Sequence, residues 1–364
     1  MRGLMFFTDP HIGKNLVANT TPESRTRMGV EMGARVVSAI QGAEYLGYRS
    51  FCGGDLFDKF DNSAAVLSVG AEIVGRCGAV LGGNHDYENN SMSYSSLDFL
   101  AEFVSKCSIF ENIVRPCYGE AVSSVVHACP NARVVMVPHH CDQDLFDKAL
   151  NEACTSSLKD DDITTFLMLH CNYDCDHITN DTALNLTRAR AVELLQHFDY
   201  ILIGHDHNAK TDFDDRLIVM GSINPTCFGD CHIDHSVWYW NFESKEFTQE
   251  VVWEADKRYL EIDASDFIAA ETITDKDFIR VTGKLLSEQV PELSKKVKAV
   301  WKSEKPPYAL RIDATVVVEA LEGEVEDLGK PVSFYRKMES AIEKDPEMLA
   351  IWSEITAELK GDAQ

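Results

Sequence analysis

Four short strings of metal-binding and proton-transferring side chains occur in this chain, each after an apolar run that is typical of a buried strand. They are Thr8-Asp9-Pro10-His11, Gly53-Gly54-Asp55-Leu56-Phe57-Asp58, Gly82-Gly83-Asn84-His85-Asp86 and Gly204-His205-Asp206-His207. A fifth strand-like run, Thr165 to Leu169, ends in His170. Carboxylate, amide and imidazole ligands without a thiolate suit Mn²⁺, Fe²⁺ or Zn²⁺. The repeated position at strand ends predicts that one site collects these side chains.

A set of this size can hold two metal ions. In open α/β sheets, ligands gather outside the carboxyl ends of the strands, and the sequence places seven candidate ligands there: Asp9, His11, Asp55, Asn84, His170, His205 and His207. A carboxylate such as Asp55 can bridge two ions about 3.5–4 Å apart, which activate water for an in-line phosphoryl displacement. A single Asp or His at a strand end is more often a cap, so the inference depends on the whole set. The implied reaction is hydrolysis of a phosphate ester.

The elements that must position these side chains alternate between strand and helix. Apolar patterns predict strands at 4–7, 48–52 and 77–81 and helices at about 28–46, 62–75 and 96–105. This alternation predicts a largely parallel sheet covered by helices. Further along, we expect a short run at 109–110, a hairpin of 120–128 with 132–137, helices at 143–157 and 187–197, and strands at 165–169, 200–203, 216–220 and 236–242.

The pattern restarts after Tyr259 and predicts a small β-α-β cap. Its parts are a strand at 278–282, a helix at 287–302 and a strand at 309–318. An acidic linker then leads to two amphipathic tail helices. We therefore expect four parts: a catalytic domain at 1–255, a cap at 256–318, a linker at 319–330 and a helical tail at 331–364.

The composition narrows the classes of function. The formal charge of −25 over 364 residues argues against adhesion of the whole surface to nucleic acid or to an anionic membrane. Eleven scattered cysteines indicate reduced thiols, and no apolar stretch reaches the eighteen residues of a membrane span. We expect a soluble cytoplasmic protein.

The strings together resemble those of the calcineurin-like metallophosphoesterases. The matching residues are Asp9-x-His11, Gly54-Asp55-x-x-Asp58, Gly83-Asn84-His85-Asp86, His170 and Gly204-His205-x-His207. Gly221-Ser222, Pro225 and Phe228-Gly229-Asp230 also resemble a segment of the SbcD-type DNA repair nucleases, in a compact version like those of bacteriophages. The resemblance covers residues 1 to about 253 and implies an α/β sandwich of mixed β-sheets flanked by helices.

The resemblance also implies roles for individual residues. Asp9, His11, Asp55 and His207 would hold one metal ion, and Asp55, Asn84, His170 and His205 the other. His85 would orient the phosphate and protonate the leaving oxygen, with Asp86 orienting its imidazole. Asp58 stands where archaeal and eukaryotic members carry His, so it would either position substrate or lie behind the ligands.

By the same resemblance we expect a nuclease with two divalent ions, Mn²⁺ first and Mg²⁺ second. It would act as an exonuclease on double strands and an endonuclease on single strands. Its expected partners are DNA, an SMC-like ABC ATPase of SbcC type and a second copy of the chain. A phosphatase or cyclic-nucleotide phosphodiesterase would use the same metals, and a non-catalytic scaffold would be expected to have lost ligands, whereas none is missing here.

Other clusters of chemistry-bearing residues have weaker grounds. His139-His140 could be a ligand pair, but the implied set is full without them, so a loop role is expected. Cys171, Cys175, Cys227, Cys231 and His232 could form a zinc site, although their spacings are not those of common zinc loops.

Two segments are candidates for binding partners. Lys295, Lys296, Lys298 and Lys302 form the densest basic cluster and could contact DNA phosphates, although a solvated helix face is the ordinary interpretation. The tail carries two apolar stripes that we expect to bind the ATPase, unless they fold back on the core: Phe334, Met338, Ile342, Leu349, Trp352, Ile355 and Leu359.

Overall fold

The computed structural model describes residues 1–14, 22–87, 95–106, 113–115, 120–156, 162–175, 184–273 and 276–317. Residues 1–317 form one compact unit. The predicted linker, the tail helices with their stripe residues, and the run at 109–110 lie outside the described residues.

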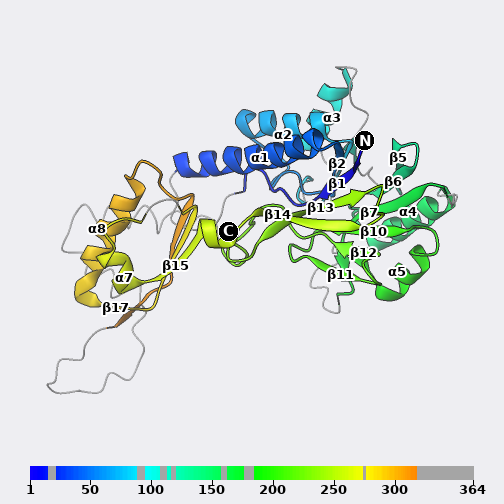
Figure 1. The fold of residues 1–364 in the computed structure, drawn as a ribbon. Helices are drawn as coiled ribbons and strands as arrows, with labels where there is room; N and C mark the ends of the chain where they lie inside the picture. Colours follow the sequence, from blue (N-terminus) through cyan, green and yellow to red (C-terminus); the bar gives the residue numbers. More distant parts are fainter. Residues whose placement is uncertain are drawn as a thin grey trace. The chain divides into compact units, whose positions relative to one another are not determined.

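Two six-stranded mixed sheets make up the larger part of this unit (Figure 1). In spatial order, the first sheet contains β14 (Phe247–Trp253), β13 (His235–Asn241), β1 (Gly3–Phe7), β2 (Tyr48–Cys52), β3 (Ala79–Leu81) and β4 (Ile113–Val114). The second contains β11 (Lys210–Asp212), β12 (Leu217–Val219), β10 (Tyr200–Gly204), β7 (Thr164–His170), β6 (Ala132–Val137) and β5 (Ser124–Cys129). In the first sheet, β1, β2, β3 and β4 pair in parallel, and β13 and β14 pair antiparallel at the other edge. In the second sheet, β12, β10, β7 and β6 pair in parallel, and the edge strands β11 and β5 pair antiparallel.

The inner strands of each sheet are largely buried on both faces, because alternate side chains of a strand enter different cores, whereas the edge strands β14 and β11 are largely exposed. Leu4 and Phe6 of β1 pack between the two sheets, whereas Met5 and Phe7 pack against the helices on the outer face. Helices α1 (Pro22–Tyr45), α2 (Ala64–Arg76) and α3 (Ser96–Lys106) cover the first sheet. Helices α4 (Gln143–Ser156) and α5 (Arg188–Leu194) cover the second. The expected sandwich of mixed sheets flanked by helices is confirmed.

The short pair β8 (Asn172–Tyr173) and β9 (Asn185–Leu186) lies between β7 and α5 in sequence. It was not expected from the sequence. After β14, the chain passes through the four-residue α6 (Ala255–Arg258) before the second part of the unit begins.

The second part is a smaller α+β arrangement. Strands β15 (Tyr259–Asp263), β16 (Phe278–Thr282) and β18 (Ala309–Ile312) form a parallel sheet, and β17 (Lys284–Leu286) pairs with β19 (Thr315–Val317). Helices α7 (Ala264–Ala269) and α8 (Val290–Trp301) pack on its core. The expected strand at 309–318 is therefore two strands in different sheets, and the expected helix at 287–302 begins with a 3₁₀ turn, Ser287–Gln289. The boundary that we place at residue 255 stays a prediction.

Candidate metal centre

The seven candidate ligands come together at the edge where the parallel strands of both sheets end. Asp9 and His11 follow β1, Asp55 follows β2 and Asn84 follows β3, while His170 ends β7 and His205 follows β10. Backbone hydrogen bonds hold the first two loops side by side, since the amides of Asp9 and His11 donate to the carbonyls of Gly54 and Asp55 over 3.0 Å each. The site is thus built from both sheets.

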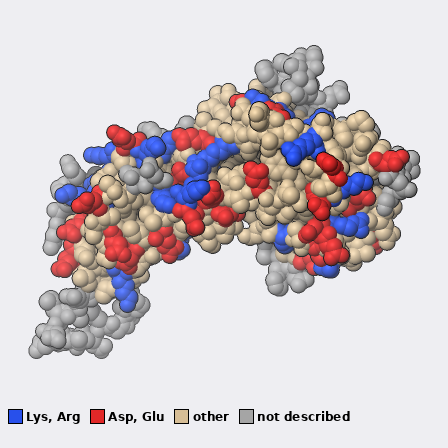
Figure 2. Space-filling model, viewed as in Figure 1, with Lys and Arg blue, Asp and Glu red and all other residues tan. Residues whose placement is uncertain are grey.

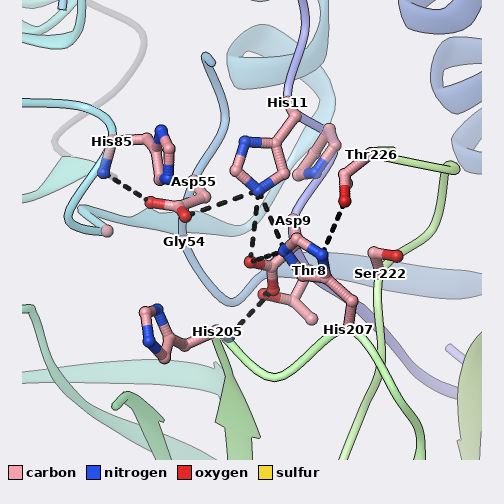
Figure 3. Close-up of polar contacts among 12 residues, drawn as sticks. Thr8, Asp9, His11, Gly54, Asp55, His85, His205, His207, Ser222 and Thr226 are labelled. Carbon is pink, nitrogen blue, oxygen red and sulfur yellow. Dashed lines mark hydrogen bonds and ion pairs between the residues drawn. The ribbon is translucent and has the colours of Figure 1, made fainter. Parts of the chain in front are cut away.

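The first group consists of Asp9, His11 and His207 (Figure 3). The Nε2 atoms of His11 and His207 are 3.2 Å apart, and each lies 3.6 Å from Oδ1 of Asp9. The other Asp9 oxygen accepts hydrogen bonds from the Thr8 hydroxyl and from the His205 amide. This leaves Oδ1 of Asp9 directed at the two imidazoles.

The second group consists of Asp55, His170 and His205, with the Asn84 side chain between the two imidazoles. Oδ1 of Asn84 lies 3.1 Å from Nε2 of His170 and 2.9 Å from Nδ1 of His205. Nδ1 of His170 donates to the Gly53 carbonyl over 2.9 Å. A carbonyl only accepts, so this contact directs the Nε2 lone pair of His170 into the site.

Asp55 lies between the two groups. Its Oδ2 is 3.5 Å from Nε2 of His11, and its Oδ1 is 3.4 Å from Nε2 of His170. Ligand atoms bound about 2.0–2.2 Å from one cation are roughly 3.0–3.6 Å from one another, which is the spacing found in both groups. One carboxylate is therefore placed to reach a cation in each group.

Unpaired polar atoms and backbone strain also favour a cation site. Oδ1 of Asp9 is buried and, within the described residues, accepts no hydrogen bond. A buried carboxylate oxygen without a donor is costly unless a cation faces it. Asp9, His11, Asp55 and His205 all have positive φ angles of 53°, 43°, 49° and 97°. Such conformations are strained for residues other than glycine and cluster at functional sites.

Two glycines permit the close approach of the loops. Gly54 has a φ of +114°, and a Cβ there would lie 2.2 Å from Nδ1 of His170. A Cβ on Gly83 would lie 2.1 Å from Oδ1 of Asp55. Larger residues at these positions would push apart the ligands of the second group.

The charges of the two groups are mutually dependent. Burial opposes protonation of His11, but Asp58, Asp9 and Asp55 outweigh it and raise its pKa to about 10. Burial likewise opposes protonation of His170, but Asp55 raises its pKa to about 9. The same imidazoles hold the pKa of Asp9 and of Asp55 well below their usual range, against the effect of burial. A divalent cation would take the place of the protons.

In the metal-free chain, we expect the melting temperature to fall as the pH rises from about 6.5 to about 10. Protonated His11 and His170 stabilise the folded state fully below the unfolded imidazole pKa of about 6.5. This stabilisation is lost as the pH passes their folded pKa values of about 9 and about 10. Mn²⁺ should remove the fall. Thermal unfolding followed by circular dichroism, with EDTA or with Mn²⁺, measures both profiles.

The exposed His197 offers a matched control. His197→Gln should leave the metal-free profile unchanged, whereas His170→Gln should remove the part of the fall that comes from His170 and leave the part that comes from His11. A melting temperature that stays constant or rises over this pH range without metal would contradict the protonation of the two imidazoles.

The structure refines the expected roles of three residues beside the ligands. The imidazole of His85 is exposed, and its Nδ1 donates to the Asp58 carbonyl over 3.0 Å. The Asp58 carboxylate lies behind His11, with Oδ1 2.6 Å from Nζ of Lys14 and 3.5 Å from Nδ1 of His11. Asp58 thus orients a candidate ligand with its side chain and His85 with its backbone.

Asp86 has a different role from the one expected. Its carboxylate is fully buried and accepts from the backbone amides of Gly83, Leu56 and Phe57 at 2.9, 3.3 and 3.0 Å. Burial, followed by the charge of Asp55, raises its pKa to about 7. The expectation that Asp86 orients the His85 imidazole is therefore corrected. Asp86 ties the loop after β2 to the loop after β3.

The histidine pair His139-His140 and the cysteine group from Cys171 to His232 form no candidate metal site within the described part of the chain. The candidate groups found there contain no cysteine. His140 bonds to backbone groups of Pro138 and Val122, and His139 is buried with its pKa lowered to about 3 by burial and then by His170. Their expected loop role fits these contacts.

Sequence reasoning missed Thr226, whose hydroxyl lies 2.6 Å from Nδ1 of His207. Thr226 falls inside the segment from Gly221 to Asp230, so the segment was recognised but the residue was not.

Residues 48–209 match the family model described as calcineurin-like phosphoesterase. This chain contains a calcineurin-like metallophosphoesterase domain. The match includes Asp55, Asn84, His85, His170, His205 and His207, and Asp9 and His11 join them from β1. It supports hydrolysis of phosphoesters at a dinuclear metal centre and leaves the metal and the substrate open.

Solved structures show distant likenesses to this chain. The protein TT1561 of Thermus thermophilus is 11% identical, with 69% of this chain and 99% of that chain covered and a TM-score of 0.41. An archaeal phosphodiesterase is 13% identical, with 68% and 98% covered and a TM-score of 0.33. The purple acid phosphatase PPD1 from yellow lupin (Lupinus luteus) seeds is 11% identical, with 68% and 52% covered and a TM-score of 0.38. Likenesses this distant carry no argument about activity.

No curated protein matches the chain significantly. None of the described helices is long and apolar enough to cross a membrane.

Proposed function

We propose that this chain is a metal-dependent DNA nuclease, an exonuclease on double strands and an endonuclease on single strands, within an SbcCD-like repair complex. The hydrolase part depends most on Asp55, whose two oxygens face His11 in one ligand group and His170 in the other. The DNA part depends on the resemblance of Gly221 to Asp230 to the SbcD-type segment.

The proposal assigns the residues of the site to metal binding or to proton transfer. Asp9, His11, Asp55 and His207 would hold one divalent ion, and Asp55, Asn84, His170 and His205 the other, with Mn²⁺ the favoured ion. When bound, such a pair lowers the pKa of water and stabilises charge on phosphoryl oxygens. His85 would protonate the leaving oxygen through Nε2, because Nδ1 is held by the Asp58 carbonyl.

An assay with two substrates tests the proposal. Linear duplex DNA labelled at its ends and bis-p-nitrophenyl phosphate would be offered with Mn²⁺ and with EDTA. Release of nucleotides from the duplex with Mn²⁺ supports the nuclease. Hydrolysis of the small diester without any cleavage of duplex or single-stranded DNA would favour a small-molecule phosphodiesterase. Metal binding without either reaction would favour a non-catalytic scaffold.

The basic cluster on α8 is the proposed contact for DNA phosphates. Figure 2 shows Asp and Glu side chains spread over the face in view, with Lys and Arg among them. Three of the cluster's lysines are exposed and are spaced to lie on one face near the C-terminal end of α8: Lys295, Lys298 and Lys302. The fourth, Lys296, is half-buried, and its Nζ donates to the Ala270 carbonyl. The first three are therefore the better candidates, and Lys296 supports α8 against the end of α7.

Replacing Lys295, Lys298 and Lys302 together by Glu should weaken duplex DNA binding and flatten its salt dependence. Each lost phosphate contact should reduce the slope of log K against log salt by about 0.9. Fluorescence anisotropy at several salt concentrations measures the slope, and cleavage of the small diester should stay unchanged.

The exposed Lys148, Lys245 and Lys257 provide a control of equal charge. Replacing these three by Glu should leave the slope near that of the wild type. Equal loss in both variants would mean that only the net charge matters, and α8 would not be a DNA contact.

The proposed partners are an SMC-like ATPase and a second copy of the chain. The stripes from Phe334 to Leu359 remain the proposed docking segment for the ATPase, on the sequence pattern alone. Co-purification of the ATPase with the full chain, and its loss after removal of residues 331–364, would test this assignment.

A further inference from the structure

Nδ1 of His207, the ring nitrogen that faces away from Asp9 and His11, contacts a side chain rather than a backbone group. Nε2 of His207 faces Asp9 and His11, so an imidazole that binds a cation through Nε2 must carry its proton on Nδ1. Nδ1 then donates to the Thr226 hydroxyl, which lies 2.6 Å away (Figure 3).

The Thr226 hydroxyl passes the hydrogen bond on to a carboxylate. It donates to Oδ2 of Asp230 over 2.8 Å. The same carboxylate accepts from the backbone amides of Thr226 and Cys227, with the shortest contacts at 3.0 and 2.9 Å. Thr226 and Asp230 are both buried. The hydroxyl proton is thus directed at Asp230, which leaves the lone pairs of the oxygen free to accept the proton of Nδ1 of His207.

The loop from Thr226 to Asp230 is also fixed by the packing of Phe228. Phe228 packs edge-on against Phe278 of β16, with ring centroids 5.9 Å apart. Both rings belong to a buried cluster that includes Met28 and Met32 of α1 and Tyr308 before β18. These contacts fix the loop between Thr226 and Asp230 independently of any cation.

We propose that Thr226 and Asp230 are positioning residues that fix the tautomer and direction of His207 and set the affinity of the metal site made with Asp9 and His11. The inference rests on the proposed metal centre. Partners of this kind on the outer nitrogen of a metal-binding histidine typically change metal affinity about 10–100-fold. His170 in the other group is held by the Gly53 carbonyl, so it does not depend on Thr226.

The test compares Thr226→Val with Thr226→Ser in the full chain. Valine keeps the shape but can neither accept from Nδ1 nor donate to Asp230, whereas serine can do both. Free Mn²⁺ is measured by electron paramagnetic resonance during titration, which gives the number and affinity of the sites without any assay of cleavage. We expect Thr226→Val to weaken one of two sites about 10–100-fold and to leave the other unchanged. Thr226→Ser should bind as the wild type does.

Asp230→Asn is the second variant, since it should weaken the same site if valine unfolds the loop. Thermal unfolding of each metal-free variant shows whether the fold is intact. Two sites of wild-type affinity in a folded Thr226→Val or Asp230→Asn chain would overturn the proposal, as would equal weakening of both sites.

The same data separate this inference from the proposed nuclease function. Selective loss of one site in a chain that cleaves no DNA would keep the positioning role and reject the nuclease. A wild-type chain that cleaves DNA, with unchanged Mn²⁺ binding in Thr226→Val, would keep the nuclease and reject the positioning role.

Discussion

Replacing Asp55 by Asn is expected to abolish metal-dependent cleavage and to weaken both metal sites at once. Its two carboxylate oxygens face His11 and His170 over 3.5 and 3.4 Å, and an amide lacks the charge that offsets two cations. The loss should exceed the roughly 100-fold cost of removing a partner that only touches a ligand. Mn²⁺ titration and cleavage of duplex DNA measure the two effects.

Asp206 provides the matched control for Asp55. It lies between His205 and His207 in sequence, but its carboxylate pairs with Lys210 over 3.1 Å and accepts from the Asn208 amide. Asp206→Asn removes one charge near the site without removing a ligand, so binding and cleavage should stay close to those of the wild type. Near-normal Mn²⁺-dependent cleavage by Asp55→Asn would contradict the assignment of Asp55 as a ligand of both metal ions.

The alternation of strands and helices could be predicted from the sequence, because each apolar run or stripe is visible in the order of residues. The division of the strands into two sheets could not be predicted from these patterns, and only the family resemblance implied it. Leu4 and Phe6 face one core while Met5 and Phe7 face another, so the strand is apolar throughout and its pattern does not reveal what covers each face.

Two features of the smaller α+β part were also not predictable from the sequence pattern. The apolar run at 309–318 gives no sign that β18 ends at Ile312 and that β19 pairs in another sheet. The helix was expected from residue 287, whereas α8 begins at Val290 with Pro291 in its first turn. The preceding 3₁₀ turn depends on packing that the sequence pattern does not record.

Much of the candidate site could be predicted because its ligands directly follow strands that end at one edge. The supporting contacts could not, since they depend on how the loops turn. Asp86 is adjacent to His85 in sequence but bonds to the backbone of another loop, and Thr226 has no spacing that links it to His207. The candidate ligands could be chosen from the sequence, whereas the contacts of Asp86 and Thr226 could not.

Replacing His85 by Gln is expected to lower the rate of cleavage about 10²–10⁴-fold while both metal sites keep their affinity. His85 is exposed, its imidazole is held by the Asp58 carbonyl through Nδ1, and it shares with the second group only a hydrogen bond from its backbone amide to Asp55. Glutamine keeps that amide and much of the side-chain volume but cannot supply a proton near neutral pH. Single-turnover cleavage and Mn²⁺ titration of the same preparation measure the two quantities.

A substrate whose leaving group needs no proton gives the sharpest control for His85. p-Nitrophenolate leaves as a stable anion, so His85→Gln should impair hydrolysis of bis-p-nitrophenyl phosphate far less than cleavage of DNA. Equal impairment on both substrates would mean that His85 positions the phosphate rather than protonates the leaving oxygen. Loss of a bound Mn²⁺ in His85→Gln would make the imidazole a ligand, because His11, Asp58 and His85 also lie close enough together to share a cation.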